Sequence, residues 1–171
     1  MNTVMEIAEK EKTSFLVAMG EIVVTALPDA VLACVGLGSC IAVCGYDGVA
    51  KVGGMVHVVM PQSHALTNNN PAKFADTAVP LLVSEITKLG GVRERLTVKM
   101  AGGAQIIIAV GIKDIFNTGE KNAAEITAAL EREKIPLAAA DVGGTHGRTV
   151  RMYLDTGRIT IKSVNGDIRE L

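Results

Sequence analysis

The stretch VLACVGLGSCIAVCGYDGVAKVGGMVHVVM, residues 31–60, decides the fold of this chain. Two apolar runs rich in Val and Ile, residues 41–46 and 51–60, are separated by Asp47-Gly48. Asp-Gly between two such runs is a strong hairpin signal. The stretch therefore predicts that residues 41–46 and 51–60 pair as an antiparallel hairpin.

A glycine-rich turn, VGLGSC at residues 35–40, precedes the hairpin. Glycine lets a backbone turn sharply, and successive N–H groups in such a turn can form an oxyanion hole. A thiol directly after the turn would lie beside donors aimed at its own acyl adduct. Although a free cysteine is more often a small buried hydrophobe, Cys40 is therefore a candidate nucleophile, with Gly38 and Ser39 as turn support. Cys34 and Cys44 lie within apolar runs and are predicted to be core.

One histidine, His57, lies in the second run of the hairpin. A lone histidine in such a strand is usually a satisfied core residue. A tight turn at Asp47-Gly48, however, would place position 57 opposite positions 38–40. The sequence therefore predicts that Cys40 and His57 are cross-strand neighbours and can form a nucleophile–base dyad.

The remaining pattern predicts an α/β (α+β) fold, a single compact sandwich of mainly antiparallel strands with two principal helices. Helical spacing of apolar residues predicts one helix from residue 71 or 76 to 89 and another over 119–133. Short apolar runs predict further strands at residues 15–19, 21–26, 31–35, 96–100, 105–110, 136–140, 150–154 and 158–162. We expect a flexible lead (1–12), one domain (13–165) and a short tail (166–171), since no repeat or linker divides the chain.

The composition excludes several classes of function. The chain has 171 residues, a formal net charge of −1 and 3% aromatic residues, so it lacks the basic footprint and stacking surface of a nucleic-acid-binding protein. No apolar run reaches the roughly 18 residues that membrane insertion needs. The first 12 residues are polar and lack the apolar centre of a signal peptide. We therefore expect a cytoplasmic protein whose three cysteines are reduced.

Two ligand sites are weaker interpretations of the same residues. Cys40, Cys44, His57 and His64 could nominally bind zinc, but there is no second cysteine pair with the spacing of structural zinc sites. Gly36-x-Gly38 is similar to a dinucleotide loop, but Ile41 occupies the place of the third glycine. We expect no metal and no cofactor. His146 could line a site or simply be solvated in its loop.

The motifs, in their order along the chain, resemble the chemoreceptor glutamine deamidase (CheD) family. The resemblance covers roughly residues 15–162 and is carried by these runs: Gly36-Leu37-Gly38-Ser39-Cys40, Gly53-Gly54-Met55-Val56-His57, Met60-Pro61, Lys73-Phe74-Ala75-Asp76, Ala101-Gly102-Gly103-Ala104, Gly119-Glu120-Lys121-Asn122, Asp141-Val142-Gly143-Gly144 and Gly147-Arg148.

The resemblance implies an activity, a substrate and a partner. The activity is hydrolysis of selected glutamine side chains of bacterial chemoreceptors to glutamate, a cytoplasmic reaction of chemotaxis. The partner is the CheC-type phosphatase of the chemotaxis response regulator. The implied fold is a compact α/β sandwich, in which Cys40 and His57 match the nucleophile and the base.

One position departs from the family pattern. The family commonly has a threonine six residues before the nucleophile, thought to orient the histidine, and Cys34 stands there in this chain. A thiol is a poorer hydrogen-bonding group than a hydroxyl, so the orienting role is either weakened or supplied by a backbone carbonyl. The alternative function is therefore a binding or regulatory module for the phosphatase and the receptors, with weak or no catalysis.

Overall fold

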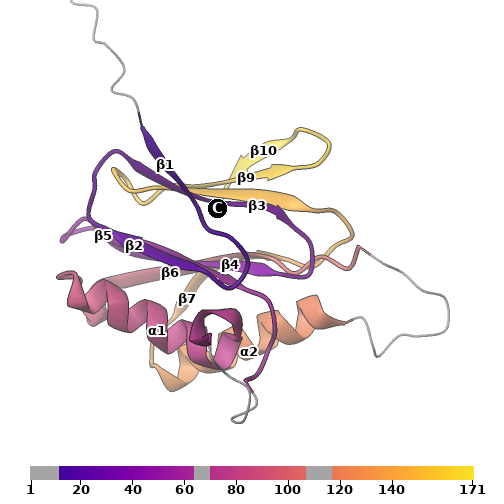
Figure 1. Cartoon of the computed structure of the whole chain (residues 1–171), viewed down its shortest axis with the longest axis horizontal. Helices are drawn as coiled ribbons and strands as arrows, with labels where there is room; N and C mark the ends of the chain where they lie inside the picture. Colours follow the sequence, from indigo (N-terminus) through magenta and orange to yellow (C-terminus); the bar gives the residue numbers. More distant parts are fainter. Residues whose placement is uncertain (1–11, 64–69, 107–116) are drawn as a thin grey trace, which may run out of the picture.

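The computed structural model describes residues 12–63, 70–106 and 117–171. Within these residues the chain forms two β-sheets of five strands each and two α-helices, stacked in three layers (Figure 1). The first sheet has the strand order β1 (Thr13–Leu16), β3 (Ala30–Leu37), β8 (Arg148–Tyr153), β9 (Ile159–Ser163) and β10 (Ile168–Glu170). The second sheet has the order β2 (Ile22–Thr25), β5 (Val52–Val58), β4 (Ile41–Asp47), β6 (Leu96–Gly102) and β7 (Leu137–Val142). The helical elements are α1 (Ala75–Lys88), α2 (Thr118–Arg132) and the 3₁₀ helices η1 (Pro71–Lys73) and η2 (Arg93–Arg95).

The strand β4 lies at the centre of the second sheet and is buried along its whole length. Side chains alternate between the two faces of a strand. Accordingly, Ile41 and Val43 belong to the core beneath α1 and α2, whereas Ala42 and Cys44 belong to the core between the sheets. The helices therefore cover only the outer face of the second sheet, which leaves its inner face to pack on the first sheet (Figure 1).

The predicted sandwich of mainly antiparallel strands with two principal helices is confirmed. In the described part of the chain, the pairs β1–β3 and β6–β7 are parallel and the other strand pairs are antiparallel. The predicted strand at residues 15–19 is shifted, since β1 ends at Leu16. The predicted strand at 105–110 lies mostly outside the described residues. Residues 166–171, treated above as a tail, contain β10, which pairs with β9.

The hairpin of β4 and β5 is confirmed, but its predicted register is wrong. Asp47 pairs with Val52 and Ala42 pairs with His57, so the connecting loop has four residues, 48–51, instead of a two-residue turn at Asp47-Gly48. Position 57 therefore lies opposite Ala42 and not opposite positions 38–40. Each additional residue in a hairpin loop moves the register of everything beyond it.

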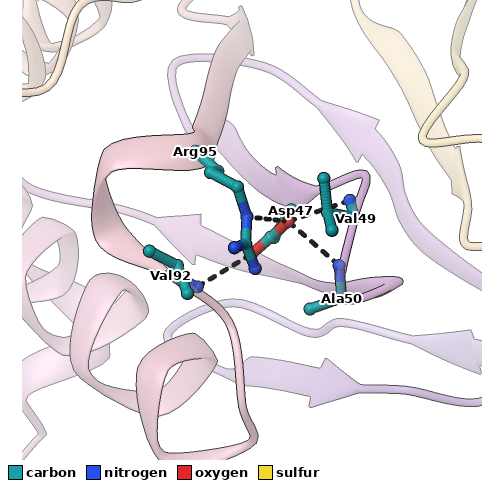
Figure 2. A network of polar contacts seen from close by, with 5 residues as sticks. All are labelled: Asp47, Val49, Ala50, Val92 and Arg95. Atoms are coloured by element: carbon teal, nitrogen blue, oxygen red, sulfur yellow. Dashed lines mark hydrogen bonds and ion pairs between the residues drawn. The ribbon is translucent and has the colours of Figure 1, made fainter.

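The side chain of Asp47 explains the longer loop. Its carboxylate is 0% exposed and accepts hydrogen bonds from the backbone N–H groups of Val49 (2.9 Å) and Ala50 (3.1 Å), which closes the loop from inside. It also accepts from the N–H of Val92 (2.8 Å) and from the Arg95 guanidinium (2.7 Å), as Figure 2 shows. The hairpin loop is thereby tied to η2, and these bonds hold the pKa of Asp47 well below its usual range.

Candidate active site

The turn that carries Cys40 is where the chain crosses from the first sheet to the second, between β3 and β4. Gly36 has a φ of 67°, a backbone conformation that favours glycine. At Gly38, a Cβ would lie 3.1 Å from the side chain of Ile106, so glycine allows that side chain to approach closely. Cys40 is half-buried and packs against the edge of the core between the sheets. The thiol therefore lies at the end of the inter-sheet core and retains access to solvent.

The turn is held in place through its carbonyl groups. The Gly38 carbonyl accepts from the N–H of Ala104 (2.8 Å), and the Cys40 carbonyl accepts from the N–H of Gly103 (2.8 Å). Between them, the Ser39 carbonyl accepts from the side-chain amide of Asn122 (3.1 Å). Among the described residues, no acceptor pairs with the N–H groups of Gly38, Ser39 and Cys40. The turn therefore has three unpaired N–H groups at and just before Cys40, and these are candidate donors for an oxyanion hole.

A second glycine-rich segment, residues 102–103, packs against the backbone of Cys40. Gly102 has a φ of 129°, and a Cβ there would lie 2.3 Å from the Cys40 carbonyl oxygen, so only glycine fits. The Arg148 guanidinium, 8% exposed, donates to the carbonyls of Gly102 (3.0 Å) and Gly143 (2.7 Å) and pairs with Asp141 (3.2 Å). Arg148 thus joins the glycine-rich segment at residues 102–103, which contacts Cys40, to the one at residues 143–144.

His57 lies on β5, is 5% exposed and points into the core between the sheets, as does its partner Ala42. Cys40 lies directly before β4 and precedes Ala42 by two residues, so it is diagonal to His57 at the same end of the second sheet. In the described part of the chain, no hydrogen bond joins Cys40 Sγ to His57. The sequence predicted that Cys40 and His57 lie directly opposite each other, and in the structure they are diagonal instead.

The carbonyl of Val17 holds the imidazole of His57. The distance from its oxygen to His57 Nδ1 is 3.0 Å. Because a carbonyl only accepts hydrogen bonds, this contact assigns the proton to Nδ1 and leaves the lone pair on Nε2. Val17 follows β1 of the first sheet, so the imidazole bridges the two sheets. A general base of this kind needs such an orienting partner.

Cys34 makes no direct contact with the imidazole in the described hydrogen-bond network. Its thiol is fully buried, contacts the same Val17 carbonyl (3.5 Å) and lies 3.4 Å from Met55 Sδ. The backbone carbonyl, the second possibility raised by the sequence, is thus the group that bonds to His57. The predicted burial of Cys34 and Cys44 is confirmed, and burial raises the pKa of the Cys44 thiol to about 12.

The electrostatics favour neutral groups at the site. Burial raises the pKa of the Cys40 thiol above its ordinary value. Burial also lowers the pKa of His57, opposed by the bond to Val17 and by the charge of Glu21. Both shifts favour the uncharged forms, a thiol and a neutral imidazole. That arrangement can act by general-base transfer of the thiol proton.

Other candidates from the sequence do not join this site. No cluster of three or more His, Cys, Asp or Glu side chains that could hold a metal ion occurs among the described residues, and His64 lies outside them. His146 is an exposed loop residue whose Nδ1 contacts Thr145 Oγ1 (3.2 Å). In the ranges that the structure describes, no helix has the length and apolar character to cross a membrane.

Sequence reasoning missed the roles of Asn122, Arg148 and Val17 in building the site. Asn122 and Arg148 do stand in the motifs Gly119–Asn122 and Gly147–Arg148, so a polar residue that ends a glycine-containing motif was the available signal. Val17 carried no such signal, since a backbone carbonyl belongs to every residue.

Fold and site together define a class: a two-sheet α+β protein with a half-buried cysteine and a buried histidine at one end of the interface between its sheets. Residues 59–163 match the family described as CheD chemotactic sensory transduction. The chain belongs to this family.

Several curated relatives are similar over most of their length. A protein of Desulfitobacterium hafniense named probable chemoreceptor glutamine deamidase CheD is 42% identical over 149 residues, 87% of this chain and 92% of the relative. The chemoreceptor glutamine deamidase CheD of Thermotoga maritima is 41% identical over 151 residues, 88% of this chain and 92% of the relative. A probable CheD deamidase of Desulforamulus reducens is 39% identical over 166 residues, covering 96% and 99%.

Proposed function

We propose that this chain is a protein-glutamine deamidase that converts glutamine side chains of chemoreceptors to glutamate, with Cys40 as nucleophile and His57 as general base. The activity and substrate follow the names of the relatives. The observation that carries the assignment of residues is the half-buried Cys40 thiol at the same end of the sheet as His57, whose Nδ1 is bonded to Val17.

The first half of the reaction is acylation of the thiol. His57 Nε2 takes the proton of Cys40, and the sulfur attacks the carbon of the glutamine side-chain amide. Negative charge develops on the amide oxygen, where the unpaired N–H groups of residues 38–40 can donate to it. A donor of this kind contributes about 3–4 kcal/mol to transition-state stability in a well-studied protease. The imidazolium then gives its proton to the amide nitrogen, the C–N bond breaks and ammonia leaves.

The second half is hydrolysis of the thioester. His57 Nε2 takes a proton from water, the hydroxide oxygen attacks the acyl carbon, and the same N–H groups receive the oxyanion again. The C–S bond then breaks and the imidazolium returns a proton to the sulfur. The receptor leaves with a glutamate side chain in place of glutamine. Neither half calls for a metal or a cofactor.

Substrate binding has a defined task in this scheme. The free protein holds Cys40 and His57 in diagonal positions without a hydrogen bond between them, and catalytic hydrogen bonds commonly tighten only when substrate is bound. We expect a bound glutamine side chain to bring the Cys40 thiol and His57 Nε2 into hydrogen-bonding distance.

Mass spectrometry of a receptor fragment tests the proposal. The fragment is incubated with wild type, Cys40→Ala and Cys44→Ala, and conversion of glutamine to glutamate is read from its tryptic peptides. We expect conversion by wild type and by the Cys44 variant, since Cys44 is a core thiol, and none by Cys40→Ala. Equal conversion by Cys40→Ala and wild type would rule out Cys40 as the nucleophile.

A binding or regulatory module for the receptors and a CheC-type phosphatase is the second candidate. The missing hydrogen bond between Cys40 and His57, together with the raised pKa of Cys40, favours it. Binding of wild type to the receptor fragment without conversion supports this candidate over the first. Co-elution with a CheC-type phosphatase in size-exclusion chromatography tests the partner, which is compatible with either function. The cytoplasmic location expected from the sequence stays a prediction.

A further inference from the structure

The side chain of Asn122, on α2, is 0% exposed and makes two hydrogen bonds next to the candidate active site. Its Nδ2 donates to the carbonyl of Ser39 (3.1 Å) and to the carbonyl of Val59 (3.0 Å). Ser39 immediately precedes Cys40, and Val59 follows the strand of His57. One buried amide on the helix layer therefore reaches both segments that carry the dyad.

The oxygen of the same amide has no hydrogen-bond partner. Asn122 Oδ1 is buried and unpaired within the described structure. Buried polar atoms are nearly always paired, and an exception calls for an explanation. Asparagine is thus retained here despite the cost of one buried oxygen without a partner. What the amide supplies is its two N–H donors, both directed at the active-site backbone.

The bond to Ser39 has a geometric consequence for Cys40. The peptide unit between these two residues is planar and trans, so its C=O and N–H groups point in opposite directions. When Asn122 fixes the direction of the Ser39 carbonyl, it also fixes the direction of the Cys40 N–H. That N–H is one of the unpaired donors beside the thiol.

His57 does not depend on Asn122 in the same way. Its backbone N–H donates to the carbonyl of Glu21 (3.0 Å), its carbonyl accepts from the N–H of Gly20 (3.0 Å), and its Nδ1 contacts Val17. Its strand also pairs with β4 and β2 on both sides. The bond from Asn122 to Val59 therefore anchors the amide itself, and the bond to Ser39 is the one with a mechanistic effect.

We propose that Asn122 is a positioning residue that aims the Cys40 N–H at the developing oxyanion. This inference rests on the proposed function in one respect, that Cys40 is the residue acylated. It predicts a defect in steps that form a tetrahedral intermediate and none in the intrinsic reactivity of the thiol. The two kinds of step can be measured separately on the same cysteine.

Acylation is measured with p-nitrophenyl acetate. The Cys40 sulfur attacks the ester carbon, p-nitrophenolate leaves with the electron pair of the C–O bond, and the thiol proton passes to His57 or to solvent. Alkylation is measured with iodoacetamide, where the sulfur displaces iodide and no oxyanion forms. Mass spectrometry quantifies both adducts at Cys40, which separates them from any adduct at Cys34 or Cys44.

For Asn122→Leu we expect acylation to be slower by about 10- to 100-fold, since a donor is misdirected rather than deleted. Alkylation, which depends on the thiolate fraction, should change by less than about twofold. Asn122→Ala is the second variant, because its smaller side chain cannot clash. The matched control is Ile126→Val, a fully buried residue of the same helix, which should leave both rates unchanged.

Three outcomes overturn the inference: no acylation of wild-type Cys40, equal loss of acylation and alkylation in the variants, or no loss of either. Equal loss would assign Asn122 a purely structural role. Failure of the proposed function looks different. In that case wild type does not convert receptor glutamine, but the Asn122 variants still show slower acylation and unchanged alkylation of Cys40.

Discussion

The two ends of the β4–β5 hairpin are built on opposite principles. At the loop end, both oxygens of the Asp47 carboxylate are bonded, to the loop backbone, to Val92 and to Arg95 (Figure 2). At the other end, the N–H groups of residues 38–40 are unpaired in the described structure, and Asn122 leaves a buried oxygen without a partner.

Under the proposed function, the loop end serves stability and the cysteine end serves chemistry. A buried carboxylate is stable only when its hydrogen bonds are complete, and the loop end supplies them. An enzyme site needs donors that stay free until the reaction develops charge. Changes at the two ends should therefore have separable effects, on activity at the cysteine end and on stability at the loop end.

After Cys40→Ala, the largest effect should come from His57→Gln. Loss of the general base should lower kcat for receptor deamidation by about 10²- to 10⁴-fold. Thermal unfolding should change little, since the amide of glutamine can still donate to the Val17 carbonyl. His146→Gln is the matched control, an exposed histidine in a loop, and should keep wild-type kcat. A variant at His57 with full activity would remove this residue from the mechanism.

A substitution at the loop end should lower the stability of the protein. Asp47→Asn weakens the bond to Arg95. It also places an amide N–H group opposite backbone N–H donors, where no hydrogen bond can form. The free energy of unfolding should therefore fall by about 1–3 kcal/mol. Urea denaturation measures this loss. The activity of the folded protein should stay at the wild-type level. The control is Asp155→Asn, an exposed partner of Lys12, for which a loss below about 1 kcal/mol is expected. A kcat defect in Asp47→Asn would mean that the two ends are coupled.

The acid response should distinguish the two ends further. The folded-state pKa of Asp47 lies below its unfolded value, which is about 3.9. Its contribution is therefore complete above that value and is lost as the pH falls toward the folded pKa. Urea midpoints measured from pH 6 to pH 2 should fall more steeply for wild type than for Asp47→Asn. Parallel curves would show that this carboxylate contributes nothing to acid stability.

At the cysteine end, the reactivity of Cys40 should depend on alkaline pH. Burial raises the pKa of Cys40, so the thiolate becomes abundant only above the ordinary cysteine value of about 8.5. The rate of alkylation at Cys40 should therefore increase with pH and have its inflection above that value. An inflection near neutral pH would instead indicate a thiolate–imidazolium pair in the free protein.

The smallest effect should come from Cys34→Thr. Since Val17 already bonds to His57 Nδ1, a hydroxyl at position 34 would alter only the second contact to the same carbonyl. We expect kcat to change by less than about threefold, the size of one weak neutral hydrogen bond. A tenfold gain would show that the missing hydroxyl limits the enzyme and that the carbonyl of Val17 is a poor substitute.

Local pattern in the sequence was enough to predict much of the fold. Alternating or continuous apolar runs and helical spacing depend on near neighbours, so the hairpin, the two helices and the burial of Cys34 and Cys44 were all predictable. The dyad of Cys40 and His57 stays a prediction. The four-residue loop was not predictable, because Asp47 closes it with the help of Val92 and Arg95, which lie far along the chain.

By itself, then, the sequence determined which two residues are proposed to carry the chemistry: a thiol after a glycine turn and a histidine in the following hairpin. Only the tertiary structure decided how they are held. Asn122 reaches Ser39 across 83 positions, and Val17 reaches His57 across 40. Contacts of that separation arise when layers pack, and no local periodicity encodes which carbonyl a buried side chain will meet.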